Sequence, residues 1–192
     1  TFFPKMSFEQ GIPEEATALV VVPTLLPNVQ RVKELVQQLE VHYLANREDH
    51  LYFALLGDLK DAETEVLPND QDIIDTALEE IKKLNDKYAS GQDIFFFFSR
   101  HRIFSPQQNR WMGWERKRGA LVELNNFLTG QKETSFNHIP KHTLALRKVK
   151  YVITLDADTK IPLHMARKMI GTISHPLNRP VFDEQKGIVV EG

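Results

Sequence analysis

The chain has 192 residues, of which 42% are hydrophobic and 26% are charged, an ordinary composition for a globular domain. Its net charge of -2 provides no basic excess for nucleic acid or an anionic membrane surface. Cysteine is absent, which excludes disulfides, thiolate zinc sites and cysteine nucleophiles. No stretch approaches the roughly 20 apolar residues of a membrane helix, and no signal peptide is visible.

Apolar runs alternate with helical patterns along the chain. After an irregular extension over 1–17, we expect strands at 18–22, 51–56, 94–98, 151–155 and 187–190. We expect helices at 28–43, 72–89, 115–128 and 162–171, with Asn28 as an N-cap and Pro162 in the first turn of the last one. Polar loops or linkers are expected at 100–114, 131–143 and 175–180.

This alternation predicts an α/β fold with a mostly parallel central sheet and helices on both faces. We expect one such domain over 18–192. Because the chain lacks an initial Met and stops directly after an expected strand, we expect it to be a piece of a longer protein. In a parallel sheet the loops after the strands share one edge, where ligands of open α/β sheets bind.

Two carboxylates, Asp156 and Asp158, follow the expected strand 151–155, which has little polar alternation and is expected to be buried on both faces. Adjacent carboxylates repel each other unless a cation joins them, and hard divalent cations prefer such oxygen ligands. The sequence therefore predicts metal or phosphate chemistry here. The alternative is that each Asp is a turn former or a helix cap.

Other polar groups are expected at the same edge. They are Pro23 and Thr24 after the first strand, Asp58 with Lys60 and Asp61 after the second, and the cationic run 99–102 after the third. We expect the arginines of that run to supply charge for phosphate. No glycine-rich dinucleotide fingerprint and no P-loop motif is present.

A basic cluster, which includes Lys117 and Arg118, begins the expected helix 115–128. Cations do not suit the positive end of a helix dipole, so this cluster is better explained by a bound anion such as a diphosphate. The alternative is a solvated basic face, as most charge runs are.

Three longer strings of sequence carry a resemblance to a known family. They are Tyr151-Val-Ile-Thr-Leu-Asp-Ala-Asp-Thr159, His175-Pro-Leu-Asn-Arg-Pro180 and Trp111-Met-Gly-Trp-Glu-Arg-Lys-Arg-Gly-Ala-Leu121. With them the chain, from about residue 18 to its end, resembles the glycosyltransferase region of cyclic β-1,2-glucan synthases. These are large polytopic inner-membrane proteins of bacteria, and this region is similar to processive GT-A transferases that use UDP-glucose.

The resemblance implies a Rossmann-like GT-A fold and a role for each matching residue. Asp156 and Asp158 match the Asp-x-Asp motif that holds Mg²⁺ or Mn²⁺ on the nucleotide diphosphate. Asp58 matches the acid that contacts uracil or ribose, and Pro23 and Thr24 match the loop that lines the base. Lys117 matches the Lys of a Lys-x-Gly-x-Leu pattern near the phosphates, with Arg118 beside it.

The resemblance also implies the partners and the setting: a UDP-glucose donor, a β-glucan acceptor, inversion at the sugar, and the cytoplasmic face of the inner membrane, reached through parent segments outside this chain. Gln107-x-x-Arg110-Trp111 spells the family's glucan-holding motif but precedes the Asp-x-Asp, so we interpret it as coincidence. We expect the true motif and the general base further along the parent.

Two other readings of the acidic motif remain open. Asp156-Ala-Asp158-Thr159 also spells the nucleophile motif of haloacid-dehalogenase-type phosphatases, although that motif normally follows the first strand of its domain. A non-catalytic nucleotide-sugar-binding domain is the other reading, since no general base is identified.

Two further groups of residues are candidate ligand sites with ordinary structural alternatives. A zinc site at His138 and His142 is disfavoured because Pro140 interrupts any helix that would pair them. Trp111 and Trp114 could stack on a sugar or a base, but aromatic side chains beside a helix start more often pack against the protein.

Overall fold

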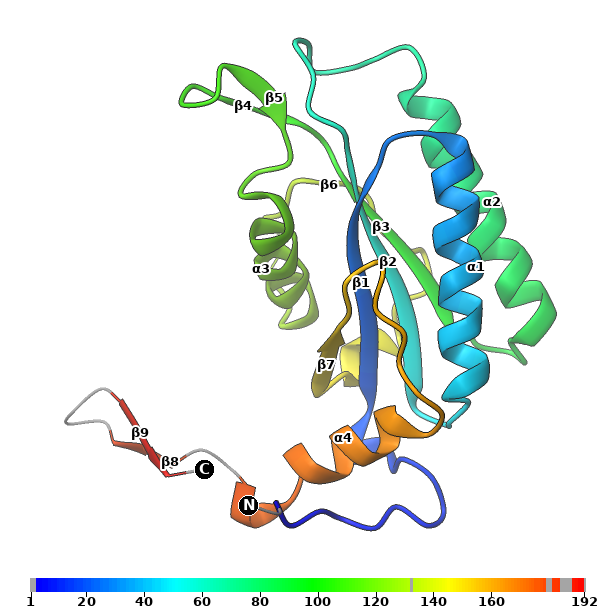
Figure 1. Cartoon of the computed structure of the whole chain (residues 1–192), viewed down its shortest axis with the longest axis vertical. Helices are drawn as coiled ribbons and strands as arrows, with labels where there is room; N and C mark the ends of the chain where they lie inside the picture. Colours follow the sequence, from blue (N-terminus) through cyan, green and yellow to red (C-terminus); the bar gives the residue numbers. More distant parts are fainter. Residues whose placement is uncertain (1–2, 132, 179–180, 184–187, 192) are drawn as a thin grey trace.

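A computed structural model describes residues 3–131, 133–178, 181–183 and 188–191 (Figure 1). Its strands are β1 (Ala18–Leu26), β2 (Leu51–Leu59), β3 (Phe95–Arg100), β4 (Ile103–Ser105), β5 (Arg110–Met112), β6 (Phe136–His138), β7 (Tyr151–Thr154), β8 (Val181–Asp183) and β9 (Ile188–Glu191). Its α-helices are α1 (Val29–Ala45), α2 (Asp70–Tyr88), α3 (Arg116–Leu128) and α4 (Met165–Ile173). Single 3₁₀ turns occur at Glu14–Ala16, Leu146–Lys148 and Pro176–Asn178.

The central sheet has the strand order β6-β3-β2-β1-β7. Strands β3, β2, β1 and β7 are parallel, and β6 pairs antiparallel with β3. Helices α1 and α2 cover one face of this sheet, and α3 lies against the other face (Figure 1). The predicted α/β architecture, with a mostly parallel sheet between helices, is confirmed.

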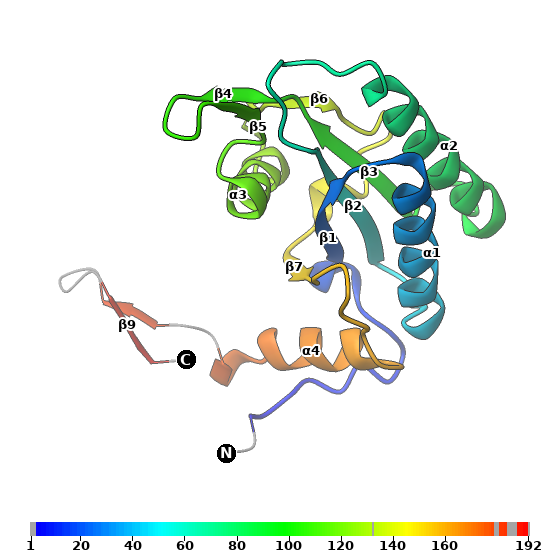
Figure 2. The ribbon, with the colours of Figure 1, turned by 45° about the horizontal axis from the view of Figure 1, so that its top comes forward.

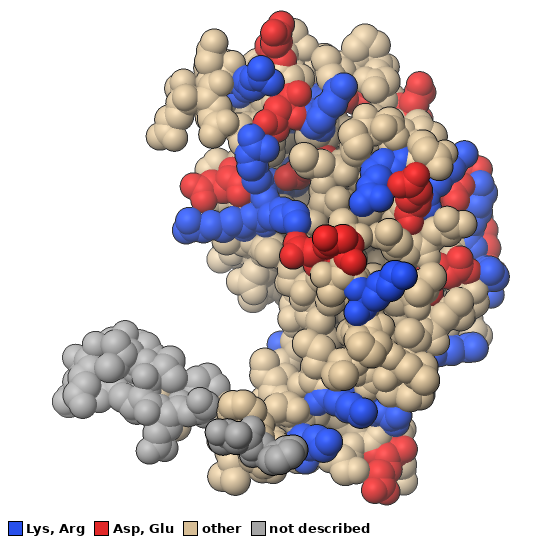
Figure 3. All heavy atoms as spheres, viewed as in Figure 1, with Lys and Arg blue, Asp and Glu red and all other residues tan. Residues whose placement is uncertain are grey.

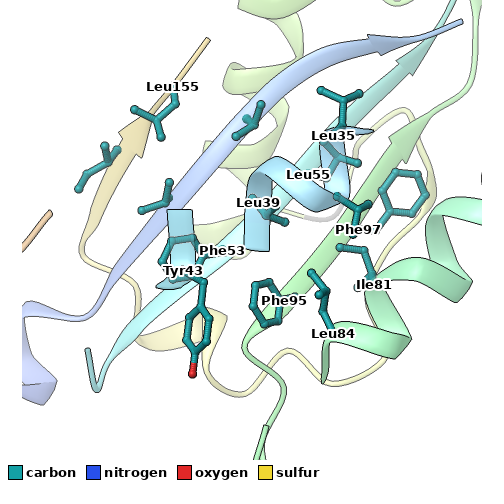
Figure 4. Packing of buried hydrophobic residues seen from close by; sticks show 14 of the residues in the cluster. Leu35, Leu39, Tyr43, Phe53, Leu55, Ile81, Leu84, Phe95, Phe97 and Leu155 are labelled. Atoms are coloured by element: carbon teal, nitrogen blue, oxygen red, sulfur yellow. The ribbon is translucent and has the colours of Figure 1, made fainter. Parts of the chain in front are cut away.

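The larger part of the core lies between the sheet and helices α1 and α2. Figure 4 shows side chains of α1 and α2 meeting those of β2 and β3, among them Leu39, Tyr43, Phe53, Ile81, Phe95 and Phe97. The Tyr43 ring packs edge-on against Phe53 and Phe95, with ring centroids 5.7 and 5.1 Å apart. Side chains at alternate positions of the same strands, such as Phe96 and Phe98, fill a smaller core under α3.

The first strand is longer than predicted, because it continues through the expected loop to Leu26. The Val21 carbonyl accepts a hydrogen bond from the Leu155 amide, so Val21 points its backbone groups toward β7. Pro23, two residues on, faces the same side, where β7 has already ended. Its missing N–H therefore breaks no ladder bond, and the strand can run through the proline.

Strand β7 also differs from the prediction that it is buried on both faces. Within the described residues it pairs only with β1, so it is an edge strand of the sheet. Ile153 is buried on the α1 side, but Val152 is 43% exposed and Thr154 is exposed on the opposite face. The continuous apolar run reflects burial of one face only.

Four short strands, β4, β5, β6 and β8, were not predicted, and one expected strand lies in a different sheet. The expected loop 100–114 contains the β4–β5 hairpin, and the expected linker 131–143 contains β6. Helix α4 begins at Met165, so Pro162 precedes it rather than lying in its first turn. Strand β9 pairs with β8 in a separate two-stranded sheet instead of joining the central one. The start of the expected strand, at 187, and residues 179–180 of the expected loop lie outside the described residues.

Candidate functional site

The carboxyl edge of the sheet is stepped, and the candidate site lies at the step. Strands β1 and β2 stay paired as far as Leu26 and Leu59, whereas the last pair of β1 and β7 joins Val21 to Thr154. Strand β1 thus runs five residues past β7, or about 16 Å at the usual rise of a strand. The loop that carries Asp156 and Asp158 begins at this step, beside the extended end of β1 (Figure 2).

A cavity of about 370 Å³ lies between the ends of β1 and β2 and the start of α3. This volume is within the usual range for small-molecule sites. All five residues predicted to bind substrate, Pro23, Thr24, Asp58, Lys117 and Arg118, line it. Its other lining residues are Leu25, Leu56, Glu115, Arg116 and Ala120. The structure therefore brings together groups from three separate segments.

Lys117 connects this cavity to the acidic loop. Its Nζ lies 2.6 Å from Oδ1 of Asp156, and both side chains are more than half exposed. An ion pair exposed to this degree contributes little to the free energy of unfolding. Its position is more informative than its energy, because it places a cation of α3 next to the first carboxylate of the Asp-x-Asp motif. Figure 3 shows acidic and basic side chains gathered on this face of the molecule.

Asp158 lies on the other side of the same loop. It is exposed, and it lines a neighbouring groove of about 620 Å³ against α1 rather than the 370 Å³ cavity. Within the described residues, no three His, Asp or Glu side chains are close enough together to hold a metal ion. Two exposed carboxylates on one short loop do suit a hard divalent cation, provided that a ligand such as a diphosphate supplies further oxygens. The donor set thus fits Mg²⁺ or Mn²⁺ shared with a substrate.

Asp58 has a buried partner that was not predicted. Nε and Nη2 of Arg100 donate to the two carboxylate oxygens of Asp58 at 2.8 and 2.6 Å, and the Arg100 side chain is 0% exposed. Arg100 also donates from Nη1 to the carbonyl of Trp114 and from Nη2 to that of Arg116, both at 2.9 Å. A strand register could have suggested the pair, because Asp58 and Arg100 each stand two residues beyond a buried apolar run and pair directly across β2 and β3.

The turn that leads into α3 has an unusual backbone. Glu115 and Arg116 are left-handed, with φ of 49° and 50°, although neither is glycine. Two glycines allow other groups to approach closely. A Cβ on Gly113 would lie 2.5 Å from Oδ2 of Asp58, and a Cβ on Gly119 would lie 1.9 Å from the Trp114 carbonyl oxygen. Gly119 is the glycine of the Lys-x-Gly-x-Leu pattern, so that pattern has a steric reason here.

The arginines of the run 99–102 are not free to bind phosphate, and that part of the prediction is wrong. Arg100 is held as described, and Arg102 forms a buried bidentate pair with Asp70 at 2.5 and 2.9 Å. Arg102 also donates to the carbonyls of Lys60 and Glu65. Burial alone would raise the pKa of Asp70, but its hydrogen bonds with Arg102 and the Leu67 amide lower that pKa below the ordinary value.

The aromatic and histidine candidates behave mainly as packing groups. The Trp111 ring lies 5.7 Å from that of Phe104 within the β4–β5 hairpin, whereas Trp114 is almost half exposed next to the α3 start. His138 stacks on Phe97 with ring centroids 5.6 Å apart, and burial lowers its pKa. The disfavoured zinc site gains no support from this arrangement.

Comparison with known proteins agrees with the resemblance inferred from the three strings. No family model matches the chain. The chain is 45% identical, over 190 residues, to the cyclic beta-(1,2)-glucan synthase NdvB of Rhizobium meliloti (strain 1021). The match covers 96% of this chain and 6% of that much longer protein. The resemblance to a segment of a cyclic β-1,2-glucan synthase is therefore confirmed. None of the helices described in the structure is both long and apolar enough to cross a bilayer.

Proposed function

We propose that this chain is the donor-binding part of a glycosyltransferase that transfers glucose from UDP-glucose, with inversion, to a growing β-1,2-glucan. The observation that carries the proposal is the 370 Å³ cavity, because five residues predicted from separate segments to bind the donor all line it. The 45% identity to a cyclic β-1,2-glucan synthase supports the reaction class.

The cavity divides into two chemical ends, which suit the two ends of a nucleotide sugar. Asp58, Pro23 and Thr24 at the ends of β2 and β1 would contact the uracil and ribose, where a carboxylate can accept hydrogen bonds from N–H or hydroxyl groups. Lys117 and Arg118 at the start of α3 would contact the diphosphate as charge-assisted donors. When the donor binds, the Lys117 ammonium would leave the Asp156 carboxylate and contact a phosphate oxygen instead.

Asp156 and Asp158 would hold Mg²⁺ or Mn²⁺ against the diphosphate. A bound metal of this kind neutralises the charge that develops on the leaving UDP. In the transfer, the acceptor hydroxyl oxygen forms a bond to C1 of glucose, the bond from C1 to the diphosphate oxygen breaks, and a general base takes the hydroxyl proton. Lys117 and Arg118 would stabilise the departing diphosphate in the same step. We assign the base to no residue of this chain.

The related synthase is far longer than this chain, so the cellular location of the parent protein is also a proposal. We propose that the parent protein lies in the bacterial inner membrane with this part at the cytoplasmic face, where UDP-glucose would be available. The β-glucan acceptor would be bound with the help of parent segments outside the chain.

Calorimetric titration tests the donor site directly. We expect UDP-glucose and UDP to bind in the presence of Mn²⁺ and to lose most of their affinity with a chelator, whereas GDP-mannose should not bind. A chain that binds neither uridine nucleotide, alone or within a longer piece of its parent, would refute the proposal. Phosphate release from a generic phosphate ester, abolished in Asp156→Asn, would instead favour the phosphatase reading.

A single variant separates metal binding from stability. We expect Asp158→Ala to lose metal-dependent UDP binding while its melting temperature stays within about 2 °C of wild type, because the side chain is exposed. Asp75→Ala, which removes an exposed carboxylate from α2, is the matched control and should bind normally. A large fall in melting temperature for Asp158→Ala would mean that this carboxylate is a structural cap.

A further inference from the structure

We propose that Arg100 is a positioning residue that joins the two ends of the nucleotide cavity into one preassembled unit. This inference rests on the proposed function, because it assigns Arg100 a role in binding the donor. Arg100 does not line the cavity. It acts through Asp58 on β2 and through the turn that begins α3.

Arg100 joins β2 to the turn before α3 through its hydrogen bonds. A guanidinium has five donors in a rigid plane, and Arg100 forms four hydrogen bonds with three residues on two segments. Nε and Nη2 hold both oxygens of Asp58, and Nη1 and Nη2 reach the carbonyls of Trp114 and Arg116. Lysine has a single ammonium and cannot reproduce this set of bonds.

The turn held by Arg100 is strained. Two consecutive non-glycine residues, Glu115 and Arg116, have left-handed φ values, which persist only where the surroundings enforce them. The two carbonyls that Arg100 binds bracket this pair, one before Glu115 and one at Arg116. Lys117 and Arg118 follow directly, so the position of both cations depends on a turn that Arg100 holds.

The packing leaves no room for the Asp58–Arg100 ion pair to shift. Gly113 lies against it so closely that a Cβ there would be 2.5 Å from Oδ2 of Asp58 and 2.8 Å from Nη2 of Arg100. Glu123 of α3 lies 3.8 Å from Nη1 of Arg100 and accepts a hydrogen bond from the Ser135 hydroxyl at 2.6 Å. The Asp58 carboxylate and the α3 start are therefore fixed relative to each other before any ligand arrives.

The chain contains a matched control for this role. Arg102 is also buried, also forms a bidentate pair with a carboxylate, and also donates to two backbone carbonyls. Its hydrogen-bond acceptors are the Asp70 carboxylate and the carbonyls of Lys60 and Glu65. None of these three residues lines the 370 Å³ cavity. Substituting Lys for either arginine removes the same kind of buried network, but only one network supports the cavity.

The test compares UDP affinity among folded variants, measured by calorimetry with Mn²⁺ well below each melting temperature. We expect Arg100→Lys to weaken UDP binding about tenfold or more, since misplaced binding groups lose affinity steeply. Arg102→Lys should lower the melting temperature comparably and bind UDP within about twofold of wild type. In a double-mutant cycle, Arg100→Lys should lose less affinity in the Lys117→Ala background than in wild type, because part of its effect passes through the position of Lys117 and the rest through Asp58 and Arg118.

Two further arms keep the inference testable if a variant or the ligand fails. Gly113→Ala retains every charged group, but its methyl group should push Asp58 and Arg100 apart. We expect it to weaken UDP binding as Arg100→Lys does. Amide hydrogen exchange needs no nucleotide: residues 114–119 should exchange about tenfold faster or more in Arg100→Lys but not in Arg102→Lys.

The outcomes separate this inference from the proposed function. If wild type binds no nucleotide while exchange at 114–119 rises only in Arg100→Lys, the proposed function fails and the role of Arg100 in fixing the turn stands. UDP affinity unchanged in folded Arg100→Lys, equal losses in both lysine variants, or unchanged exchange at 114–119 would each overturn the inference.

Discussion

At Gly119, any side chain would collide with the backbone that precedes α3. Glycine in a helix interior normally costs about 1 kcal/mol relative to alanine, so alanine would be preferred on intrinsic grounds. A steric clash outweighs this preference, because a Cβ at position 119 would lie 1.9 Å from the Trp114 carbonyl oxygen. That carbonyl accepts the hydrogen bond from Nη1 of Arg100. The glycine therefore allows the buried arginine to reach its acceptor.

We expect Gly119→Ala to lower the free energy of unfolding by about 1–3 kcal/mol, the usual cost of forcing atoms into a packed site. Urea denaturation followed by circular dichroism measures this change. Asn125→Ala, at an exposed position of the same helix, is the control and should be neutral or slightly stabilising. A gain in stability for Gly119→Ala would show that the turn relaxes freely, contrary to the close approach described above.

At the scale of single elements, α1 shows how local signals and tertiary packing combine. Its N-cap was predicted correctly, since Oδ1 of Asn28 accepts a hydrogen bond from the Arg31 amide at 2.8 Å. One buried polar group on this helix, His42, could not be recognised from the sequence. His42 is 4% exposed, and its Nδ1 has no hydrogen-bond partner among the described residues. Burial lowers the pKa of His42 below the ordinary value of 6.5.

This lowered pKa predicts a pH dependence of stability. Because the unfolded chain takes up the proton at higher pH than the folded chain, the stability from neutral His42 is complete above about pH 6.5 and is lost as pH falls toward its folded pKa. We expect the free energy of unfolding of His42→Leu to fall less than that of wild type between about pH 7.5 and 5. Burial also lowers the pKa of His138, so the stability of His42→Leu should still depend on pH to some extent. His101→Leu, at an exposed position, should retain the wild-type slope; an unchanged slope in His42→Leu would contradict the prediction.

Across the whole molecule, the long buried elements could be predicted and the short ones could not. Runs such as Phe95–Phe98 indicated the parallel strands because burial on two faces demands apolar side chains throughout. Strands β4, β5 and β6 have only three residues each, too few for a hydrophobic period to be visible in the sequence. Strand β6 also depends on a partner far away in sequence, because it pairs with β3.

The candidate site likewise has a part that could be predicted from the sequence and a part that could not. Pro23, Thr24 and Asp58 could be placed at one edge because parallel topology gathers the loops after the strands, whereas Lys117 and Arg118 were placed near the phosphates by the family resemblance; all five line one cavity. Which cations are free to bind a ligand could not be predicted. Arg100 and Arg102 are buried against carboxylates 42 and 32 residues away, respectively. The Arg100 pair follows from the strand register once that register is known, and the Arg102 pair follows from the loop path; the residues next to each arginine reveal neither.

Among the residues that the structure describes, no strand pairs with the outer edge of β7, and this has a consequence for how the isolated chain behaves in solution. Backbone groups on the side of β7 away from β1 form a template onto which another extended segment can hydrogen-bond. Natural sheets protect such edges with lysine, yet β7 presents Val152 and Thr154 on its exposed face. We expect the isolated chain to self-associate as its concentration rises, in sedimentation velocity runs. Val152→Lys should shift it toward monomer, whereas Leu144→Lys, which charges an exposed leucine outside the strands, should not. Edge-to-edge aggregation would then compete with every binding experiment on this chain at high concentration, and a lysine at position 152 would suppress it.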